Sequence, residues 1–201
     1  MPVIGITGGA ASGKSRAAAL LALHFPEARL FSADQAVEDL YGSDPEVATA
    51  VAGLLGGEAL TESGGIDRGR IRERVFDAPE LRAALNAVVH PRVRARWREG
   101  AREARESKRW FFAEIPLLYE TDGQAECDQV VVVACTVETQ IRRMTLERKL
   151  SENTARQILG AQWSTERKVQ LGDFLVWNDS SLACLQRQVG LLAHWLFHTY
   201  A

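Results

Sequence analysis

The stretch Gly8-Gly9-Ala10-Ala11-Ser12-Gly13-Lys14-Ser15 decides the fold that the sequence predicts. It fits G-x-x-x-x-G-K-[ST] at every position, follows the apolar run Val3–Thr7 and precedes a helical stretch. In such a loop the backbone N–H groups surround a phosphate, and the positive end of the following helix strengthens the binding. We expect Lys14 to bind the β- and γ-phosphates of a nucleotide and Ser15 to ligate Mg²⁺. A chance glycine-rich turn is the alternative, and the strand and helix around the loop argue against it.

Five short apolar runs have the length and composition of buried strands. They are Val3–Thr7, Arg29–Ser32, Trp110–Ile115, Gln129–Cys135 and Phe174–Trp177. Helical patterns lie between them, which favours parallel strands joined by helical crossovers. The sequence therefore predicts an α/β fold with one five-stranded parallel sheet flanked by helices.

Helical patterns fill most of the chain between and after the predicted strands. They cover about 14–24, Ala36–Tyr41, Pro45–Leu55, Arg68–Phe76, Pro79–Glu106, about 138–171 and Leu182–Phe197. The span from about 34 to 108 is long for a single crossover. We expect a core of about 1–34, 108–137 and 172–201, a helical insertion of about 35–107 over the sheet's C-terminal edge, and a separate helical region of about 138–171.

Composition limits the possible partners. The 201 residues carry a formal net charge of −2, which gives no general attraction to nucleic acid or to anionic membranes. The N-terminus reads as a strand and not as a signal peptide, and no apolar run is long enough to cross a bilayer. The three cysteines are far apart and lack metal-ligand spacing, so we expect unpaired thiols in a reducing cytoplasm.

The region 138–171 is rich in arginine, which is typical of a lid that closes over phosphates in a small-molecule kinase. The arginines are Arg142, Arg143, Arg148, Arg156 and Arg167. Any one of them is more often part of a solvated helix face, but together they favour one or two contacts with phosphate. The base-reading and switch motifs of a GTPase are absent from the sequence.

Two carboxylates stand at predicted strand ends. Asp34 is expected to end the second strand, at the edge where ligands bind in open α/β sheets, and could accept a proton from a substrate hydroxyl. A helix N-cap is an equally good interpretation of Asp34. Glu114, near the end of the third strand, could hold a magnesium-bound water, or it could be an ordinary surface carboxylate.

Several segments in order resemble the dephospho-coenzyme A kinases. The segments are Gly5–Ser15, Ser32-Ala33-Asp34, Ile66–Phe76, Leu85–Pro91 with its Leu-Asn-x-x-x-His-Pro pattern, and Glu114-Ile115-Pro116-Leu117-Leu118-Tyr119-Glu120. Gln140, Arg143, Gln162 and Asn178 follow in the expected order. The resemblance spans nearly the whole chain, and the His-Pro and Pro-Leu-Leu-x-Glu pieces are far more specific than the phosphate loop.

The resemblance implies a P-loop nucleotide kinase fold with a helical substrate domain and a lid. It implies transfer of the γ-phosphate of ATP, with Mg²⁺, to the ribose 3′-hydroxyl of dephospho-coenzyme A. The catalytic residues would be Asp34 as base, Lys14 and the lid residue Arg143. ATP would be bound by Gly9, Ala10, Ala11, Ser12, Gly13, Lys14, Ser15, Arg16 and Asn178, the acceptor by Asp34, Arg74, His90, Pro116 and Leu117, and the metal by Ser15 and Glu114. Taken alone, His90 is better explained as a packed helix residue, and Pro116 can simply shape a strand exit.

Four positions depart from the family pattern. Ser32 replaces the first Asp of a pair, Arg16 stands where Thr is usual, and Glu38 stands where Arg is common. Glu147 falls where a second lid arginine is usual, and the neighbouring Arg148 is rotated from it by about 100° on a helix.

Two other functions stay open at this stage. One is a related kinase that acts on another nucleoside or small metabolite, and the other is a nucleotide-binding protein without transferase activity. The expected partner is a small-molecule substrate, with no nucleic acid and no membrane, and the expected state is a monomer or weak homo-oligomer.

Overall fold

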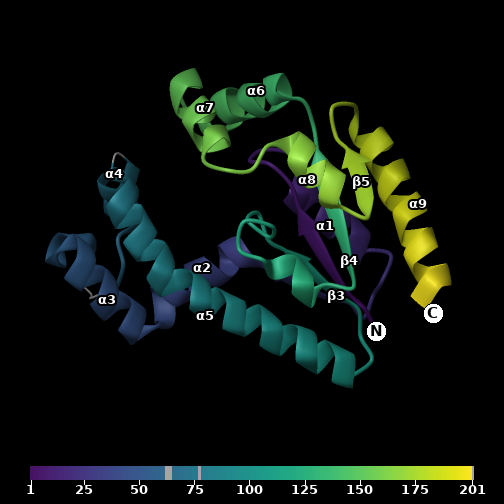
Figure 1. Ribbon diagram of the computed structural model, residues 1–201, viewed down its shortest axis with the longest axis horizontal. Helices are drawn as coiled ribbons and strands as arrows, with labels where there is room; N and C mark the ends of the chain where they lie inside the picture. The colour runs from purple at the N-terminus through teal and green to yellow at the C-terminus, as the bar shows by residue number, and fades with distance from the viewer. Residues whose placement is uncertain (62–64, 77, 201) are drawn as a thin grey trace. The chain divides into compact units, whose positions relative to one another are not determined.

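A parallel β-sheet organises the first of two compact units in the computed structural model, which describes residues 1–61, 65–76 and 78–200 (Figure 1). Its strands are β1 (Val3–Thr7), β2 (Arg29–Ser32), β3 (Phe111–Glu114), β4 (Gln129–Ala134) and β5 (Phe174–Trp177). Within the described residues the sheet has five strands in the order β2-β3-β1-β4-β5, and every pairing is parallel. This confirms the predicted sheet, with β3 one residue shorter at each end and β4 one residue shorter at its end than expected.

The strand order fixes where a ligand can bind. The chain leaves central β1 for β2 on one side, while β4 pairs with β1 on the other side. In open parallel sheets the crevice at such a switch point, outside the carboxyl ends of the strands, is the usual ligand site. The glycine-rich loop follows β1 directly and therefore lies at this point.

The helices account for most of the remaining chain. They are α1 (Lys14–Ala22), α2 (Ala33–Ser43), α3 (Pro45–Leu55), α4 (Arg68–Phe76), α5 (Pro79–Glu106), α6 (Val137–Arg148), α7 (Glu152–Gly160), α8 (Thr165–Leu171) and α9 (Leu182–Tyr200), with short 3₁₀ turns at Gly57–Ala59 and Gly123–Glu126. No helix of the described residues is both long and apolar enough to cross a membrane.

The start of α2 corrects one expectation. We expected a helix from Ala36 and Asp34 at the end of the second strand, whereas the helix begins at Ala33 and Asp34 lies in its first turn. A carboxylate in the first turn is stabilised by the helix dipole, so the helix extends back to the strand without a loop. The strand-end placement of Asp34 was therefore wrong.

The region 138–171 divides into three helices because local caps interrupt it. Lys149 adopts a left-handed conformation with φ of 54° and ends α6. Ser151 and Ser164 then cap α7 and α8, and each serine hydroxyl accepts a backbone N–H three residues on, at Thr154 and Arg167.

One face of the sheet packs against α1 and α9. Ile4, Ile6 and Val133 of the strands lie in one buried cluster with Leu21 of α1 and Leu185 of α9. This packing fixes the start of α1 beside the end of β1, as a phosphate loop requires.

The outer edge of β5 is closed by a side chain. The amide group of Gln188, on α9, accepts from the backbone N of Trp177 over 2.9 Å and donates to its carbonyl oxygen over 2.8 Å. The last residue of this edge strand therefore has both backbone groups satisfied on the side away from β4.

The chain forms two compact units. The first contains residues 1–32 and 100–201, and the second contains residues 33–99. The second unit has its own buried apolar residues, which include Leu40, Val47, Val51, Leu55 and Val89. Which segments act as substrate domain and lid stays a prediction.

Candidate active site

The glycine-rich loop has the backbone that its sequence predicts. Gly13 has φ of 93°, and a Cβ there would lie 2.2 Å from Nδ2 of Asn178. Gly8 has φ of 151°, and a Cβ there would lie 2.0 Å from the carbonyl oxygen of Val133. Both positions therefore admit only glycine, because a side chain would be strained and would collide with backbone or a buried amide.

Lys14 and Ser15 begin α1 and face the loop and the sheet. The Lys14 side chain is buried, and its Nζ donates to the carbonyl oxygen of Gly9 over 2.9 Å. Ser15 Oγ donates to Oε1 of Glu114, at the end of β3, over 2.6 Å. Glu114 is only 6% exposed and is not a surface carboxylate. The two residues that we expect at the metal thus lie together, and both offer the oxygen groups that Mg²⁺ prefers.

Two glutamines from the 138–171 region bind the loop at Ala10. Gln140 Nε2 donates to the Ala10 carbonyl oxygen over 2.7 Å, and Gln162 Oε1 accepts from the Ala10 N–H over 3.0 Å. A Cβ at Gly9 would lie 2.2 Å from Gln140 Nε2, so Gly9 permits this approach. Sequence reasoning gave these glutamines no role, although their order in the chain fits the resemblance.

Arg143 and Asn178 bind the loop from its carbonyl side. Arg143 Nη1 donates to the carbonyl oxygens of Ala11 and Ser12 over 3.1 and 3.3 Å, and Nη2 donates to that of Asn178 over 2.7 Å. Asn178 is buried, and its Nδ2 donates to the Ser12 carbonyl oxygen over 2.8 Å. All of these bonds go to backbone carbonyl oxygens. They therefore fix the carbonyl side of the loop and do not engage its N–H groups. Cys135 lies behind Arg143, and burial raises the pKa of its thiol to about 11, so the thiol is neutral near pH 7.

The remaining expected site residues of the first unit have structural bonds or lie exposed. The Pro116 carbonyl oxygen accepts from Thr7 Oγ1 over 3.1 Å, and the Leu117 carbonyl oxygen accepts from Thr121 Oγ1 over 2.8 Å. Arg16 lies exposed on α1, one residue after the loop.

Three expected residues belong to the second unit. Asp34 lies in the first turn of α2, and His90 lies inside α5, where burial lowers its pKa. Arg74 Nη1 donates to the Leu55 carbonyl oxygen over 3.0 Å and its Nη2 to Glu58 Oε2 over 2.6 Å, which fixes the C-terminal end of α3. Pro91 lies within α5, whose bounds, Pro79–Glu106, are those predicted from the sequence.

A buried ion pair ties α8 to the segment after β3. Lys168 Nζ lies 2.8 Å from Glu120 Oε1 and 2.8 Å from the Pro116 carbonyl oxygen, and the Lys168 side chain has no exposed surface. Glu120 Oε1 also accepts the Trp163 N–H over 2.9 Å. Local sequence patterns contain no sign of this pair, because its two members are far apart in the chain.

We expect Lys168→Met to lower the free energy of unfolding by about 3–5 kcal/mol, because it leaves the buried Glu120 charge without its cation. Urea denaturation measures this change. Glu120→Gln keeps an oxygen acceptor for Trp163 and Lys168 and is the milder comparison. A loss below about 1 kcal/mol for Lys168→Met would mean that solvent screens the pair as it does at a surface.

Ala11 has φ of 56°, a left-handed conformation that is unfavourable for a residue with a side chain by about 1–2 kcal/mol. Ala11→Gly should therefore raise the free energy of unfolding by about 0.5–1 kcal/mol after the larger freedom of glycine in the unfolded chain is counted. Thermal unfolding tests this, with Ala10→Gly as control because Ala10 does not have a positive φ. Equal effects at both positions would contradict the prediction.

Comparison with known proteins decides the family. Residues 2–183 match the sequence profile described as dephospho-CoA kinase. The chain belongs to the dephospho-CoA kinase family. A dephospho-CoA kinase of Chlorobaculum tepidum is 36% identical over 192 residues, which cover 93% of this chain and 91% of that protein. One of Streptomyces avermitilis is 35% identical over 187 residues, which cover 93% and 90%.

Solved structures agree with this family. A Thermus thermophilus protein matches with a TM-score of 0.77 and 31% identity over 97% of this chain and 98% of its own. The dephospho-CoA kinase of Campylobacter jejuni matches with a TM-score of 0.66 and 25% identity over 97% of each chain. A Bacteroides thetaiotaomicron shikimate kinase, at 11% identity and a TM-score of 0.55, shares the fold alone. The P-loop kinase fold predicted from the sequence is thus confirmed for this member of the dephospho-CoA kinase family.

Proposed function

We propose that this chain transfers the γ-phosphate of ATP to the ribose 3′-hydroxyl of dephospho-coenzyme A and gives coenzyme A and ADP. The observation that carries the proposal is the complete phosphate loop, with Lys14 folded over it and Ser15 bonded to Glu114, in a chain of the dephospho-CoA kinase family. Phosphoryl transfer needs positioning and charge neutralisation more than covalent chemistry, and these residues supply both.

The residues divide the work as follows. The loop N–H groups and Lys14 bind the phosphates, and Arg143, Gln140 and Gln162 hold the loop in shape. Ser15 and Glu114 would hold Mg²⁺, which when bound would supply positive charge to neutralise the phosphates. Their hydroxyl and carboxylate, 2.6 Å apart, fit such an ion.

Asp34 is the base in this proposal. Its carboxylate takes the proton of the 3′-hydroxyl as the hydroxyl oxygen bonds to the γ-phosphorus. The bond between that phosphorus and the bridging oxygen breaks, and ADP leaves with the electron pair.

Three further assignments belong to the proposal. A cytoplasmic location suits the thiols of Cys127, Cys135 and Cys184, which are all free. We also assign the second unit to the acceptor and the 138–171 region to the lid. A monomer or weak homo-oligomer is expected, and a solution mass measurement tests it.

An ADP-release assay with ATP, Mg²⁺ and a panel of acceptors tests the function. We expect turnover with dephospho-coenzyme A and a product heavier by one phosphoryl group. Turnover on a nucleoside monophosphate or on shikimate, with none on dephospho-coenzyme A, would replace the proposal by the related-kinase alternative. ATP binding without turnover on any acceptor would favour a nucleotide-binding protein.

A further inference from the structure

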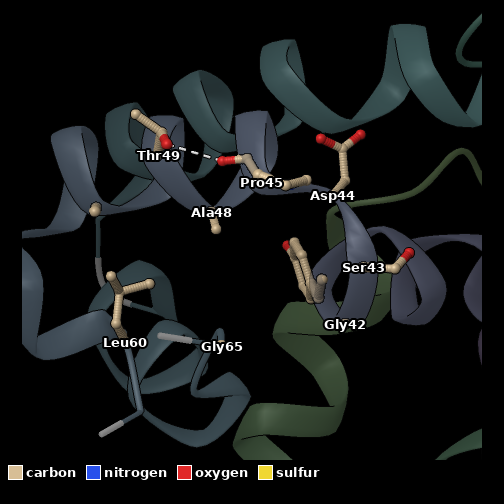
Figure 2. Close-up of a pocket in the computed structure, with 10 residues that line it drawn as sticks. Gly42, Ser43, Asp44, Pro45, Ala48, Thr49, Leu60 and Gly65 are labelled. Carbon is tan, nitrogen blue, oxygen red and sulfur yellow. Dashed lines mark hydrogen bonds between the residues drawn. The ribbon is translucent and has the colours of Figure 1, made fainter. Parts of the chain in front are cut away.

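Two glutamines hold two successive peptide groups of the phosphate loop. Gln140 Nε2 donates to the Ala10 carbonyl oxygen over 2.7 Å, and Gln162 Oε1 accepts from the Ala10 N–H over 3.0 Å. Gln140 is only 1% exposed and is the fourth residue of α6, which Thr136 caps. All of these groups lie within the first unit, whereas the pocket drawn in Figure 2 is lined by residues of the second.

The bond from Gln140 determines where the next backbone donor points. Every peptide bond of the described residues is trans, and in a trans peptide the carbonyl oxygen and the following N–H point in opposite directions. The Ala10 carbonyl oxygen and the Ala11 N–H belong to one peptide group. Because Gln140 holds the carbonyl oxygen, the Ala11 N–H points away from Gln140.

The preceding peptide group shows which side of the loop faces the phosphates. Gln162 holds its N–H, at Ala10, so its carbonyl oxygen, at Gly9, points away from Gln162. That oxygen accepts from Lys14 Nζ over 2.9 Å. The glutamines therefore lie on the outer side of the loop, and the side opposite them is the one that contains the phosphate-binding lysine.

The backbone at Ala11 does not favour this orientation by itself. Ala11 has φ of 56°, a left-handed conformation that residues with a side chain avoid. A flip of the peptide group between Ala10 and Ala11 would change ψ of the first residue and φ of the second together, and would bring Ala11 to a favourable negative φ. It would also turn the Ala10 carbonyl oxygen toward the phosphate side, where an anion repels it. The bond from Gln140 opposes this flip.

Gly13 shows the contrast with a position that needs no such support. Arg143 and Asn178 both donate to the Ser12 carbonyl oxygen, which directs the Gly13 N–H away from them. Gly13 has φ of 93°, which glycine adopts without a steric penalty. In the part of the chain that the structure describes, no acceptor binds the N–H of Gly13 or of Ala11, so both can donate to an anion.

We propose that Gln140 is a positioning residue for phosphoryl transfer, because it keeps the Ala11 N–H directed at the phosphates of ATP. The inference rests on the proposed function, which places those phosphates in the loop. Gln140 itself does not touch the nucleotide, and the contact is made by the Ala11 N–H. A hydrogen bond from an N–H to a charged phosphate oxygen is about twice as strong as one between neutral groups. A donor that is already oriented also saves the cost of turning the peptide group on binding.

Gln140→Met tests the inference, because methionine has a similar length and volume but cannot donate a hydrogen bond. We expect the KM for ATP to rise about tenfold, while the KM for dephospho-coenzyme A stays within about twofold. Gln129→Met is the matched control, since Gln129 starts β4 at the opposite edge of the sheet and donates to Tyr200 Oη over 3.0 Å. An unchanged KM for ATP in Gln140→Met, or an equal rise in both variants, would overturn the inference.

A second substitution separates positioning of the peptide group from simple fastening of α6 to the loop. Ala11→Gly removes the side chain that makes a positive φ unfavourable, so the peptide group has less reason to flip when Gln140 is lost. We therefore expect Gln140→Met to raise the KM for ATP by less than about threefold when it is introduced into an Ala11→Gly chain. A fastening role predicts the same rise with either residue at position 11, and that result would overturn the inference.

Nuclear magnetic resonance of the wild-type chain gives an answer that does not depend on a variant folding. On addition of Mg²⁺ and the β,γ-imido analogue of ATP, we expect the Ala11 amide proton to move downfield, because it gains a charged acceptor. The Ala10 amide proton, already bound by Gln162, should stay close to its position. An Ala11 resonance that stays in place while those of Gly13 and Lys14 move would overturn the inference. This titration needs no acceptor, so its failure is distinct from failure of the proposed function, which would appear as absent turnover of dephospho-coenzyme A.

Discussion

Asp34→Asn is expected to lower turnover by about two to four decades, the usual contribution of a general base, while ATP binding stays nearly unchanged. The amide has the size and hydrogen-bonding reach of the carboxylate but cannot take the proton of the acceptor hydroxyl. The residue lies in the first turn of α2, outside the phosphate loop, so nucleotide affinity should not depend on it. Steady-state rates with dephospho-coenzyme A and calorimetric titration with ATP measure the two effects separately.

The control for this substitution is Asp39→Asn. Asp39 lies on the same helix and loses the same charge, and its carboxylate accepts a hydrogen bond from Gln35 over 2.9 Å. We expect turnover within about twofold of the wild type. Near-normal turnover of Asp34→Asn would remove Asp34 as the base.

Lys14→Ala should damage both nucleotide affinity and turnover, because Lys14 supplies the point charge on the β- and γ-phosphates. We expect kcat/KM for ATP to fall by about two to three decades, the size found when one preorganised charge-stabilising donor is lost. The substitution also removes the bond from Nζ to the Gly9 carbonyl oxygen, so a thermal unfolding curve must accompany the kinetics.

Arg109→Ala is the matched control for Lys14→Ala. Arg109 precedes β3, at the opposite edge of the parallel sheet from the loop, and lies 3.6 Å from Glu27. The Arg109→Ala substitution removes one positive charge away from the phosphate site. The kinetics of this variant should therefore match those of the wild type. If Lys14→Ala and Arg109→Ala behave alike, the loop is not the phosphate site.

The strands and the phosphate loop could be predicted from the sequence because their signals are local. Buried parallel strands are continuous apolar runs, and β1, β2 and β5 have the predicted bounds. The loop pattern fixes its own backbone, since Gly8 and Gly13 occupy conformations that other residues avoid.

Other features depend on alternatives that a local pattern cannot separate. An aspartate after a strand suits a strand end and a first helical turn equally well, and the dipole of α2 decides for the turn at Asp34. The serines that divide the 138–171 region are ordinary N-cap residues, and only their bonds to Thr154 and Arg167 show that they act as caps.

The contacts that hold the site together could not be derived from the sequence. Gln162 binds Ala10 across 152 positions, and Lys168 binds the Pro116 carbonyl oxygen across 52. Such pairings arise from the packing of complete helices, and no periodicity within either segment indicates its partner. The sequence indicates Gln140 and Gln162 only through their order in the resemblance to the dephospho-coenzyme A kinases.

The bonds of Gln188 to Trp177 affect how the molecule behaves in a crowded solution. An extended peptide from a neighbour would normally find bare main-chain groups along the rim of a sheet, and such a rim can seed fibrils. At Trp177 those groups already hold an amide anchored to the chain's own C-terminal helix. A strand added from another molecule would have to displace the Gln188 amide group. Edge-to-edge pairing of two molecules is therefore disfavoured at this position.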